Sequence, residues 1–369
     1  MADSAAATGL VVQQWEDKFF TEYLQDLPIR SMMGSDENSV IQVKEDLTKK
    51  QGDSITIALV NRLNNAAVTG TSTLEGNEDD MASRSMRIYV NKRRNAVRIA
   101  EMSEQKSAIS LREAGRAVLK DWAMEDTRDL VIQALGSING DISFTASTEA
   151  QRDAWLVDNV DRIVFGAVAA PSASDFSAAV ADLDTTADKF TATVLDAAIL
   201  KAKIASPKIR PVRDGGNGKR YYVALAHPAA FKDLRDSLDT EVLAATSVQM
   251  EGSKLFEGGD LMWNGCIVKE CDNLPVYTNL GNSATTEVTP IYLLGAQAVA
   301  VAYAKRWRSK TEEFDYGDKH GIAIDGIYGV RKVLFGTGSG DTDDLKDHGV
   351  VTIFCATTAA GNTVGIAAS

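Results

Sequence analysis

Two hydrophobic periodicities run along this chain, and they predict its helices and strands. The segments SITIALV (54–60) and MRIYV (86–90) carry an apolar residue at every second position, which is typical of half-buried β-strands. Between them lies NNAAVTGTSTLEGNEDDMASRS, a polar connection much longer than an ordinary turn. We therefore predict a long β-hairpin with a polar tip within residues 54–102.

A helical repeat predicts one long helix over residues 110–135. Ser110 and Glu113 have the spacing of a capping box, in which each side chain bonds a backbone N–H of the first turn. Gly136 is suited to the position after the last turn. At 1.5 Å per residue the helix would span about 40 Å. Its expected apolar positions are Leu111, Ala114, Val118, Trp122, Leu130, Val131, Ala134 and Leu135.

Residues 1–50 have the pattern of an arm rather than of a domain. Aromatic and aliphatic side chains recur there at near-helical spacing, and a single short helix cannot bury such a stripe by itself. The stripe must pack either on its own subunit or on a neighbour, and the sequence leaves both possibilities open. Its members are Trp15, Phe19, Phe20, Tyr23, Leu24 and Leu27.

The second half of the chain mixes helices and strands. Residues 139–190 are rich in Ser, Thr, Ala and Asp around one apolar island, DRIVFG, and we predict a loop-rich insertion there. A helix is expected over 191–205, with Thr193 and Asp196 as a cap pair, and a second one begins at Pro228. Strands are expected at GKRYYVALA, CIVKEC, PVYTNL, TPIYLL and VVTIFCA. Without a βαβ rhythm, the pattern indicates an α+β fold with largely antiparallel sheets.

The overall charge narrows the classes of partner. The chain has 39 Lys and Arg against 51 Asp and Glu, a net charge of −12, so its field does not attract nucleic acid or anionic membranes. The longest nearly apolar run, IYLLGAQAVAVAYA (291–304), is too short to cross a bilayer of about 30 Å. Three cysteines suit neither a disulfide framework nor a zinc site, and they indicate free thiols in a reducing compartment.

Charge is segregated within residues 54–102. Acidic residues gather near the predicted tip and basic residues on the predicted return strand. Such a hairpin could pair with a copy of itself, or the two clusters could be solvated surface charges; both interpretations stay open. The residues are Glu75, Glu78, Asp79 and Asp80 at the tip, and Lys92, Arg93, Arg94 and Arg98 on the strand.

The segment EEFDYGDKHGIAIDGIYGVRKVLF (312–335) concentrates residues capable of acid–base or metal chemistry. Asp315, Asp318 and His320 could serve an enzyme, but neither HExxH nor G-x-S-x-G is present. DYGDKHG has the composition of a turn, and an alternating strand follows in which Gly326 and Gly329 mark bulges or close approaches. We predict the polar edge of a strand, with acids paired to Lys319 or to a neighbouring subunit, and no catalytic, cofactor-binding or metal-binding residue.

The order of these segments resembles the major capsid proteins of tailed bacteriophages with the Hong Kong 97-type fold, and most closely the capsid family of N4-like phages. The matching stretches span about residues 40–340 and include VKEDLTKKQGDSITIALVNRL, TLEGNEDD, VDRIVFG, KIRPVR, LMWNGCIVKE, YLLGAQAVAVAYAK and the 312–335 segment. The resemblance implies an N-terminal arm (1–50), an E-loop (51–102) and a P domain (103–190) that contains the spine helix 110–135 and the insertion. An A domain (191–300) and a return to the P domain with C-terminal strands (301–369) complete the layout.

The resemblance also implies a function. Hexamers and pentamers of the chain would form an icosahedral shell that encloses double-stranded DNA without sequence-specific binding, a structural role with no cofactor and no membrane. The protein would belong to the virion and assemble in the cytoplasm of the host bacterium. Expected partners are further copies of itself, a portal, a decoration or cement protein, and a scaffolding protein, which is expected to be separate because only about 50 residues precede the E-loop.

Three further expectations complete the sequence-based interpretation. No Lys–Asn crosslinking pair is recognisable, so no covalent chainmail is expected. The subunit interfaces are expected at the arm stripe and at the two charge clusters of residues 54–102. An encapsulin-type cage around protein cargo is the alternative within the same fold, and a metal-dependent enzyme using Asp315, Asp318 and His320 is the alternative outside it.

Overall fold

The computed structural model describes residues 29–45, 52–60, 67–70, 73, 75, 78, 83–213, 219–238, 261–278, 280–281, 286–338, 340–357 and 363–365. These residues form two compact units. Unit 1 comprises residues 92–127 and 306–327, and unit 2 comprises the remaining described residues. Three long elements contribute residues to both units: helix α2 (Leu111–Leu135) and strands β15 (Val299–Phe314) and β16 (Lys319–Lys332).

A nine-stranded sheet forms the centre of unit 2. Its main path runs β11-β12-β10-β14-β13-β20, with β19 paired to β14, β8 to β19 and β9 to β10. Antiparallel pairs predominate, as predicted, but β10–β12, β13–β20 and β8–β19 are parallel. The strands are β8 (Ile163–Phe165), β9 (Val212–Arg213), β10 (Arg220–Ala226), β11 (Leu261–Trp263), β12 (Cys266–Glu270), β13 (Val276–Thr278), β14 (Glu287–Leu294), β19 (Val350–Thr357) and β20 (Thr363–Gly365).

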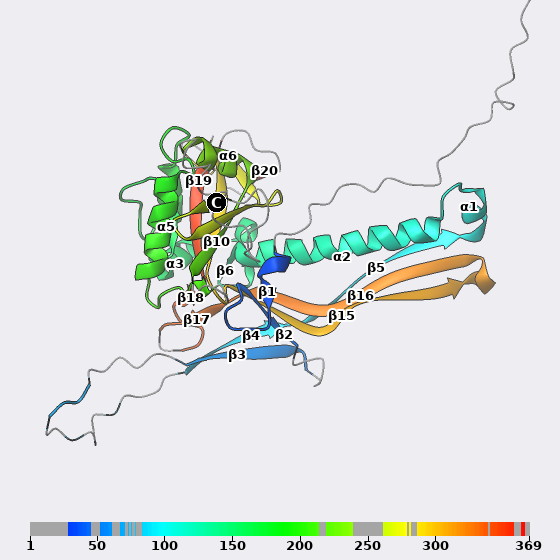
Figure 1. Ribbon diagram of the computed structural model, residues 1–369, viewed down its shortest axis with the longest axis horizontal. Coiled ribbons are helices and arrows are strands. Elements are labelled where there is room, and N and C mark those ends of the chain that lie inside the picture. Colours follow the sequence, from blue (N-terminus) through cyan, green and yellow to red (C-terminus); the bar gives the residue numbers. More distant parts are fainter. Residues whose placement is uncertain are drawn as a thin grey trace, which may run out of the picture. The chain divides into compact units, whose positions relative to one another are not determined.

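Two hydrophobic cores cover the two faces of this sheet, because alternate residues of a strand point to opposite faces. On β19, Val351, Ile353 and Cys355 face one core, and Phe354 faces the other. The first core contains helices α5 (Ala192–Ile204) and α6 (Pro228–Asp236), which lie beside strands β10 and β19 in Figure 1. A strand buried on both faces is a nearly continuous apolar run; all eight residues of β19 are buried, and only Thr352 and Thr357 among them are polar.

Helix α6 follows β10 and precedes the parallel strand β12. This crossover is a βαβ unit, which the sequence analysis did not anticipate. The helix begins at Pro228, as predicted, and the Nδ1 atom of His227 accepts a hydrogen bond of 3.2 Å from the backbone N–H of Ala229. His227 therefore serves as the N-cap of α6. Helix α5 also lies where predicted, but its N-cap is Thr191, and Asp196 instead accepts hydrogen bonds from Trp263 and Asn264.

The predicted loop-rich insertion over 139–190 is wrong. This segment contains helices α3 (Glu149–Asp158) and α4 (Phe176–Ala181), and DRIVFG contributes strand β8. Phe144, Trp155, Phe176 and Phe354 form an aromatic core, in which Phe176 meets Phe354 edge to face with centroids 5.3 Å apart. Helices of six and ten residues give little periodic signal and depend on tertiary packing for their stability, so composition alone misled the prediction.

Helix α2 has the predicted length. Ser110 Oγ accepts a long hydrogen bond of 3.5 Å from the N–H of Glu113, and the N–H of Gly136 closes the last turn on Ile132 at 3.0 Å. The expected apolar face is shifted, because Val118 is 56% exposed and the buried positions of the first turns are Gly115, Leu119 and Ala123. Gly136 does not have a positive φ. A Cβ at this position would lie only 2.9 Å from the Tyr292 hydroxyl, so the glycine leaves room for that group.

The predicted hairpin is present as strands β3 (Ser54–Val60) and β4 (Ser83–Tyr89), which pair antiparallel with Ile55 opposite Ile88. The predicted second strand of the hairpin extended too far along the chain. The hairpin closes where Val90 N–H bonds Asp53 O at 3.0 Å, and the four basic residues lie on a separate strand, β5 (Asn91–Ala100). An alternating pattern marks a strand but does not identify its partner, so the sequence could not separate β4 from β5.

Strand β5 belongs to a five-stranded sheet with the order β1-β2-β15-β16-β5. Figure 1 shows α2 running alongside the strands β5, β15 and β16. No helix of the described residues is both long and apolar enough to span a membrane. The remaining elements are β1 (Met33–Gly34), β2 (Ile41–Lys44), α1 (Glu101–Lys106), β6 (Ser137–Ile138), β7 (Ile142–Ser143), β17 (Leu334–Gly336), β18 (Leu345–Asp347) and 3-10 helices at Arg30–Met32, Phe144–Ala146 and Asp315–Gly317.

Candidate functional site

Several of the predicted interface residues cannot be placed. The arm stripe of Trp15, Phe19, Phe20 and Tyr23 lies outside the described residues, as do Asp79 and Asp80 of the hairpin tip. Glu75 and Glu78 are described, and both are exposed. Among the predicted sites, the structure therefore places mainly the four basic residues of β5.

Arg93 is the member of this basic group that points toward α2. Its guanidinium binds both carboxylate oxygens of Asp126, with 2.5 Å between Nε and Oδ2. The Asp126 side chain is only 9% exposed, so the pair is a contact within the subunit. On the same side of β5, Val97 and Ile99 pack near Gly115 of α2. Odd-numbered residues of β5 thus face the helix.

Because strand side chains alternate, the even-numbered residues of β5 face away from α2. Lys92, Arg94 and Arg98 are exposed on that side. Arg98 lies over the ring of Phe314 of β15, with 4.9 Å from its guanidinium carbon to the ring centroid. The predicted basic cluster therefore divides into one intramolecular ion pair and three cations on an exposed sheet face.

Strand β15 adds three cations to the same face, and the sequence analysis missed them. Trp307 faces α2, where it meets Trp122 edge to face at 5.8 Å and would contact a Cβ on Gly326 at 3.0 Å. Its neighbours in KRWRSK (305–310) at alternate positions, Arg306, Arg308 and Lys310, consequently face away, and all three are exposed. Basic residues at every second position around a tryptophan were the signal available in the sequence.

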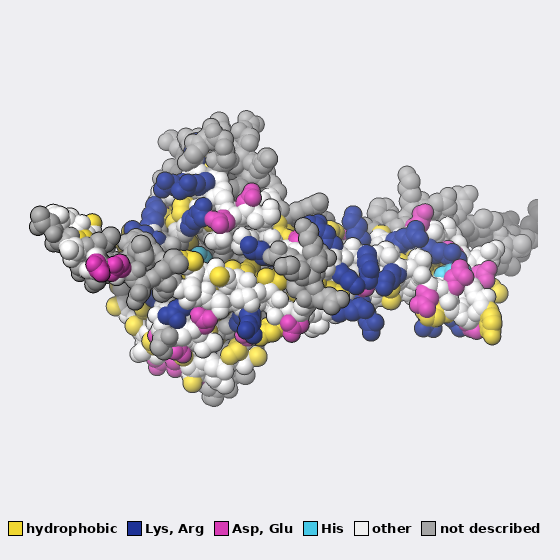
Figure 2. Space-filling model, turned by 90° about the horizontal axis from the view of Figure 1, so that it is seen from below, with side chains coloured by type: hydrophobic (Ala, Val, Ile, Leu, Met, Phe, Trp, Pro, Cys, Tyr) yellow, Lys and Arg dark blue, Asp and Glu magenta, His cyan; other side chains and the backbone are white. Residues whose placement is uncertain are grey.

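One carboxylate, Asp325 of β16, lies among these cations. Asp325 is only 7% exposed. Its carboxylate oxygens lie 2.9 Å from Arg308 Nε and 3.7 Å from Lys310 Nζ. The hydrogen bond from Arg308 lowers the pKa of Asp325, and the charges of Lys310 and Lys92 lower it further. Figure 2 views the molecule from this side and shows Lys and Arg side chains gathered there. We call the six residues the basic face: Lys92, Arg94, Arg98, Arg306, Arg308 and Lys310.

The segment DYGDKHG is a turn at the end of β15 and β16, as predicted. Asp315, Tyr316 and Gly317 have consecutive φ values of +54°, +53° and +97°. Lys319 Nζ binds Asp315 at 2.9 Å, as expected for a polar strand edge, and this hydrogen bond lowers the pKa of Asp315. His320 Nδ1 is 3.8 Å from Glu313. The side chain of Tyr316 is fully exposed, with a relative accessibility of 109%.

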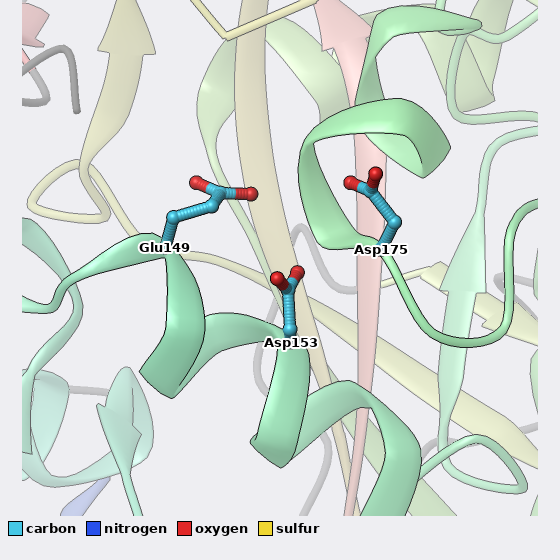
Figure 3. A group of neighbouring side chains, drawn as sticks. All are labelled: Glu149, Asp153 and Asp175. Carbon is cyan, nitrogen blue, oxygen red and sulfur yellow. The ribbon is translucent and has the colours of Figure 1, made fainter.

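A metal-like cluster of acids occurs elsewhere, at Glu149, Asp153 and Asp175 (Figure 3). Each carboxylate accepts a hydrogen bond from a different backbone N–H of the first turn of α4: Phe176 to Asp153 at 2.7 Å, Ser177 to Glu149 at 3.1 Å and Ala178 to Asp175 at 2.9 Å. Glu149 also pairs with Arg152 at 2.6 Å. Helix N-termini leave such N–H groups without intrahelical partners, so this cluster has a structural role as a three-carboxylate cap.

Comparisons with known proteins agree over nearly the whole chain. The sequence model of the family described as phage capsid protein matches residues 4–359. The major capsid protein of Pseudomonas phage KPP25 is 28% identical over 374 residues, which covers 93% of this chain and 94% of that protein. Among solved structures, the capsid asymmetric unit of cyanophage Pam1 is 28% identical and has a TM-score of 0.81, with 98% of this chain and 100% of that chain covered. The capsid of Ralstonia phage GP4, at 22% identity, shares the fold with a TM-score of 0.77, covering 97% of this chain and 99% of that one.

Proposed function

The chain belongs to the phage capsid protein family, and from that premise we propose that it assembles as hexamers and pentamers into the icosahedral shell of a tailed bacteriophage. The observation that carries this proposal is the similarity to a phage major capsid protein along almost the full length of both chains. The fold is that of the Hong Kong 97-type capsid proteins. The role is structural, and the protein is not an enzyme.

The domain layout of the family supplies a further part of the proposal. We assign residues 1–50 to the N-terminal arm, 51–102 to the E-loop, 103–190 to the P domain, 191–300 to the A domain and 301–369 to the return into the P domain. In this layout α2 is the spine helix. The β3–β4 pairing and the length of α2 support the assignment.

The shell would enclose double-stranded DNA without gripping it. With a net charge of −12, the subunit repels phosphate at long range, and affinity for DNA grows with the number of basic contacts. Packaging and release both require such weak binding. As partners we propose a portal, a separate scaffolding protein and a decoration or cement protein, with assembly in the host cytoplasm before the protein becomes part of the virion.

The proposed subunit contacts combine the arm stripe, the acids of the E-loop and the exposed cations of β5. Trp15, Phe19, Phe20 and Tyr23 would pack on a neighbouring subunit. Lys92, Arg94 and Arg98 are exposed, which supports their part in the proposal. Arg93 is better assigned to the fold of its own subunit, because it binds Asp126.

Electron microscopy of the full chain expressed in bacteria, with and without the genes that flank its own, tests the proposed function. We expect closed icosahedral particles, with better yield and uniformity when a scaffolding gene is present. The contents discriminate between the two cage types: nucleic acid in particles from infected cells supports a phage shell, and a specific enzyme as cargo would instead support an encapsulin-type cage. A chain that stays monomeric under every condition would contradict the proposal.

A further inference from the structure

The turn between β15 and β16 is held in a conformation that most side chains avoid. Asp315 and Tyr316 are non-glycine residues in the left-handed region, which side chains other than glycine seldom adopt. Three contacts hold the turn: Lys319 with Asp315 at 2.9 Å, Asp318 N–H with Asp315 O at 3.1 Å, and Glu101 N–H with Asp318 O at 2.8 Å. The subunit thus maintains a strained turn at its surface.

The strained turn presents an aromatic side chain to solvent. Tyr316 is fully exposed, so its ring adds nothing to the packing of its own subunit. Rigid, exposed aromatic residues are typical anchors of protein interfaces, because they bury a large area and lose little side-chain entropy on binding. A strained backbone that presents such a residue to solvent is a reason to propose a binding role. Acidic residues surround the ring in sequence, and we call Glu312, Glu313, Asp315, Tyr316 and Asp318 the acidic turn.

The basic face offers the complementary surface. It carries six exposed cations on strands β5 and β15 of unit 1, and Asp325 of the intervening strand β16 pairs with two of them, Arg308 and Lys310. Figure 2 shows a group of Lys and Arg side chains on this face, and toward the end of the molecule Asp and Glu side chains occur together with further Lys and Arg. The turn and the face have opposite charge, and every copy of the chain carries both, so a second copy can offer either surface to the first.

We propose that the acidic turn of one subunit docks on the basic face of a second copy of this chain, with Tyr316 as the anchor of the contact. The inference rests on the proposed shell function and adds the residues of one of its contacts. The two surfaces differ, so the contact is heterologous, and every copy can donate a turn and receive another. Such a contact can close into rings or continue between neighbouring rings, as a shell requires.

The substitution Tyr316→Gly separates this contact from the fold. Glycine adopts positive φ without strain, so the unassembled subunit should be as stable as the wild-type protein or more stable. Particle yield should nevertheless fall, by roughly ten-fold or more if Tyr316 is an interface hot spot. Asp344→Gly is the matched control, since Asp344 has a φ of +50° and lies outside the turn; its particles should form normally.

Charge reversal identifies the two partners. Glu312→Lys with Glu313→Lys reverses the turn, and Arg94→Glu with Lys310→Glu reverses the face. Each pair alone should prevent assembly, and the four substitutions together should restore it. Two outcomes would overturn the proposal. If Glu75→Lys with Glu78→Lys rescued the reversed face, the partner of the face would be the acids of the hairpin. If the reversed face gave normal particles with reduced DNA content, its partner would be nucleic acid.

These outcomes also separate the docking from the proposed function. If the wild-type chain and Tyr316→Gly form particles equally well, the docking is wrong and the shell function stands. If the wild-type chain never forms particles, the shell function is wrong and the docking falls with it. Particle number by negative-stain microscopy and subunit stability by urea unfolding supply both measurements.

Discussion

At the scale of single residues, close approaches of backbone explain the glycines that the sequence marked in β16. A Cβ on Gly329 would lie 2.0 Å from the carbonyl oxygen of Tyr89, and one on Gly326 would lie 3.0 Å from the ring of Trp307. Both glycines were predicted to mark either bulges or close approaches, and the distances confirm close approaches. The backbone of Tyr89 cannot rotate away as a side chain can, so Gly329 is the more demanding position.

Gly329→Ala should therefore destabilise the subunit by about 3 kcal/mol, the upper part of the range for overpacking. Urea unfolding of the unassembled subunit measures the change. Gly340→Ala is the control, because its nearest neighbour would be a flexible Asp343 oxygen at an ordinary 3.4 Å. Equal stability of the two variants would mean that strands β4 and β16 separate easily at Gly329.

His348 makes the subunit sensitive to acid. Burial lowers the pKa of His348 to about 4, and the positive charge of Arg162 acts in the same direction. The unfolded chain takes up a proton near pH 6.5 and the folded chain only near pH 4, so stability falls as the pH drops through this window. Once the pH lies below both pKa values, the loss of unfolding free energy attributable to His348 is about 3 kcal/mol.

The substitution His348→Phe should remove most of this dependence. The ring already meets Phe335 edge to face at 5.4 Å, so a phenyl ring suits the site. Unfolding free energies at pH 7.5 and pH 4.5 should differ by less in the variant than in the wild-type subunit. An unchanged difference would assign the acid sensitivity to other groups.

At the scale of elements, the sequence predicted those whose pattern is long or strongly periodic. Helix α2, the β3–β4 hairpin, helices α5 and α6, and strands β10, β12, β13, β14 and β19 were foreseen, whereas β9, β11 and β15 were not. Helices α3 and α4 were not, because Phe144, Trp155 and Phe176 are far apart in sequence and meet only in the folded core. Likewise, the sequence identified Lys92 and Arg94 as part of a basic cluster. It could not place Arg306, Arg308 and Lys310 on the same face, because these residues reach it only when β15 joins the sheet.

The three-carboxylate cap of α4 has a measurable contribution. Asp153→Ala removes the acceptor for the N–H of Phe176 and should cost about 1 kcal/mol of stability. Asp153→Asn retains a carbonyl acceptor and should cost less. The unfolding free energies of both variants, measured with and without a chelator, check the assignment. A loss of stability on adding the chelator to the wild-type protein would contradict a cap that works without metal.

At the scale of the whole molecule, the division of the β5 cations between fold and assembly can be tested. Lys92→Glu with Arg94→Glu should reduce particle yield and lower subunit stability much less than a change at Arg93, since both residues are exposed. Arg93→Glu should instead lower subunit stability by about 2 kcal/mol, because it leaves Asp126 without its partner. Adding Asp126→Arg to Arg93→Glu should restore much of that loss.

Two measurements separate these roles: urea unfolding for the subunit and sedimentation for particles. Assembly that depends on exposed charge should also weaken with added salt, because the screening length falls from about 10 Å at 0.1 M to about 3 Å at 1 M. Normal particle yield from Lys92→Glu with Arg94→Glu would remove these residues from the assembly contacts.

Strand β19 divides its side chains between two cores, and this has a consequence for how the gene can change. Substitutions within Val350–Thr357 alter the volume of one core and leave the other intact. Deleting or inserting a single codon there would exchange the side chains of the two cores beyond that point, because the alternation has a period of two. Length changes should therefore accumulate in surface turns, where they displace no register, and the central strands should keep their number of codons while their composition drifts.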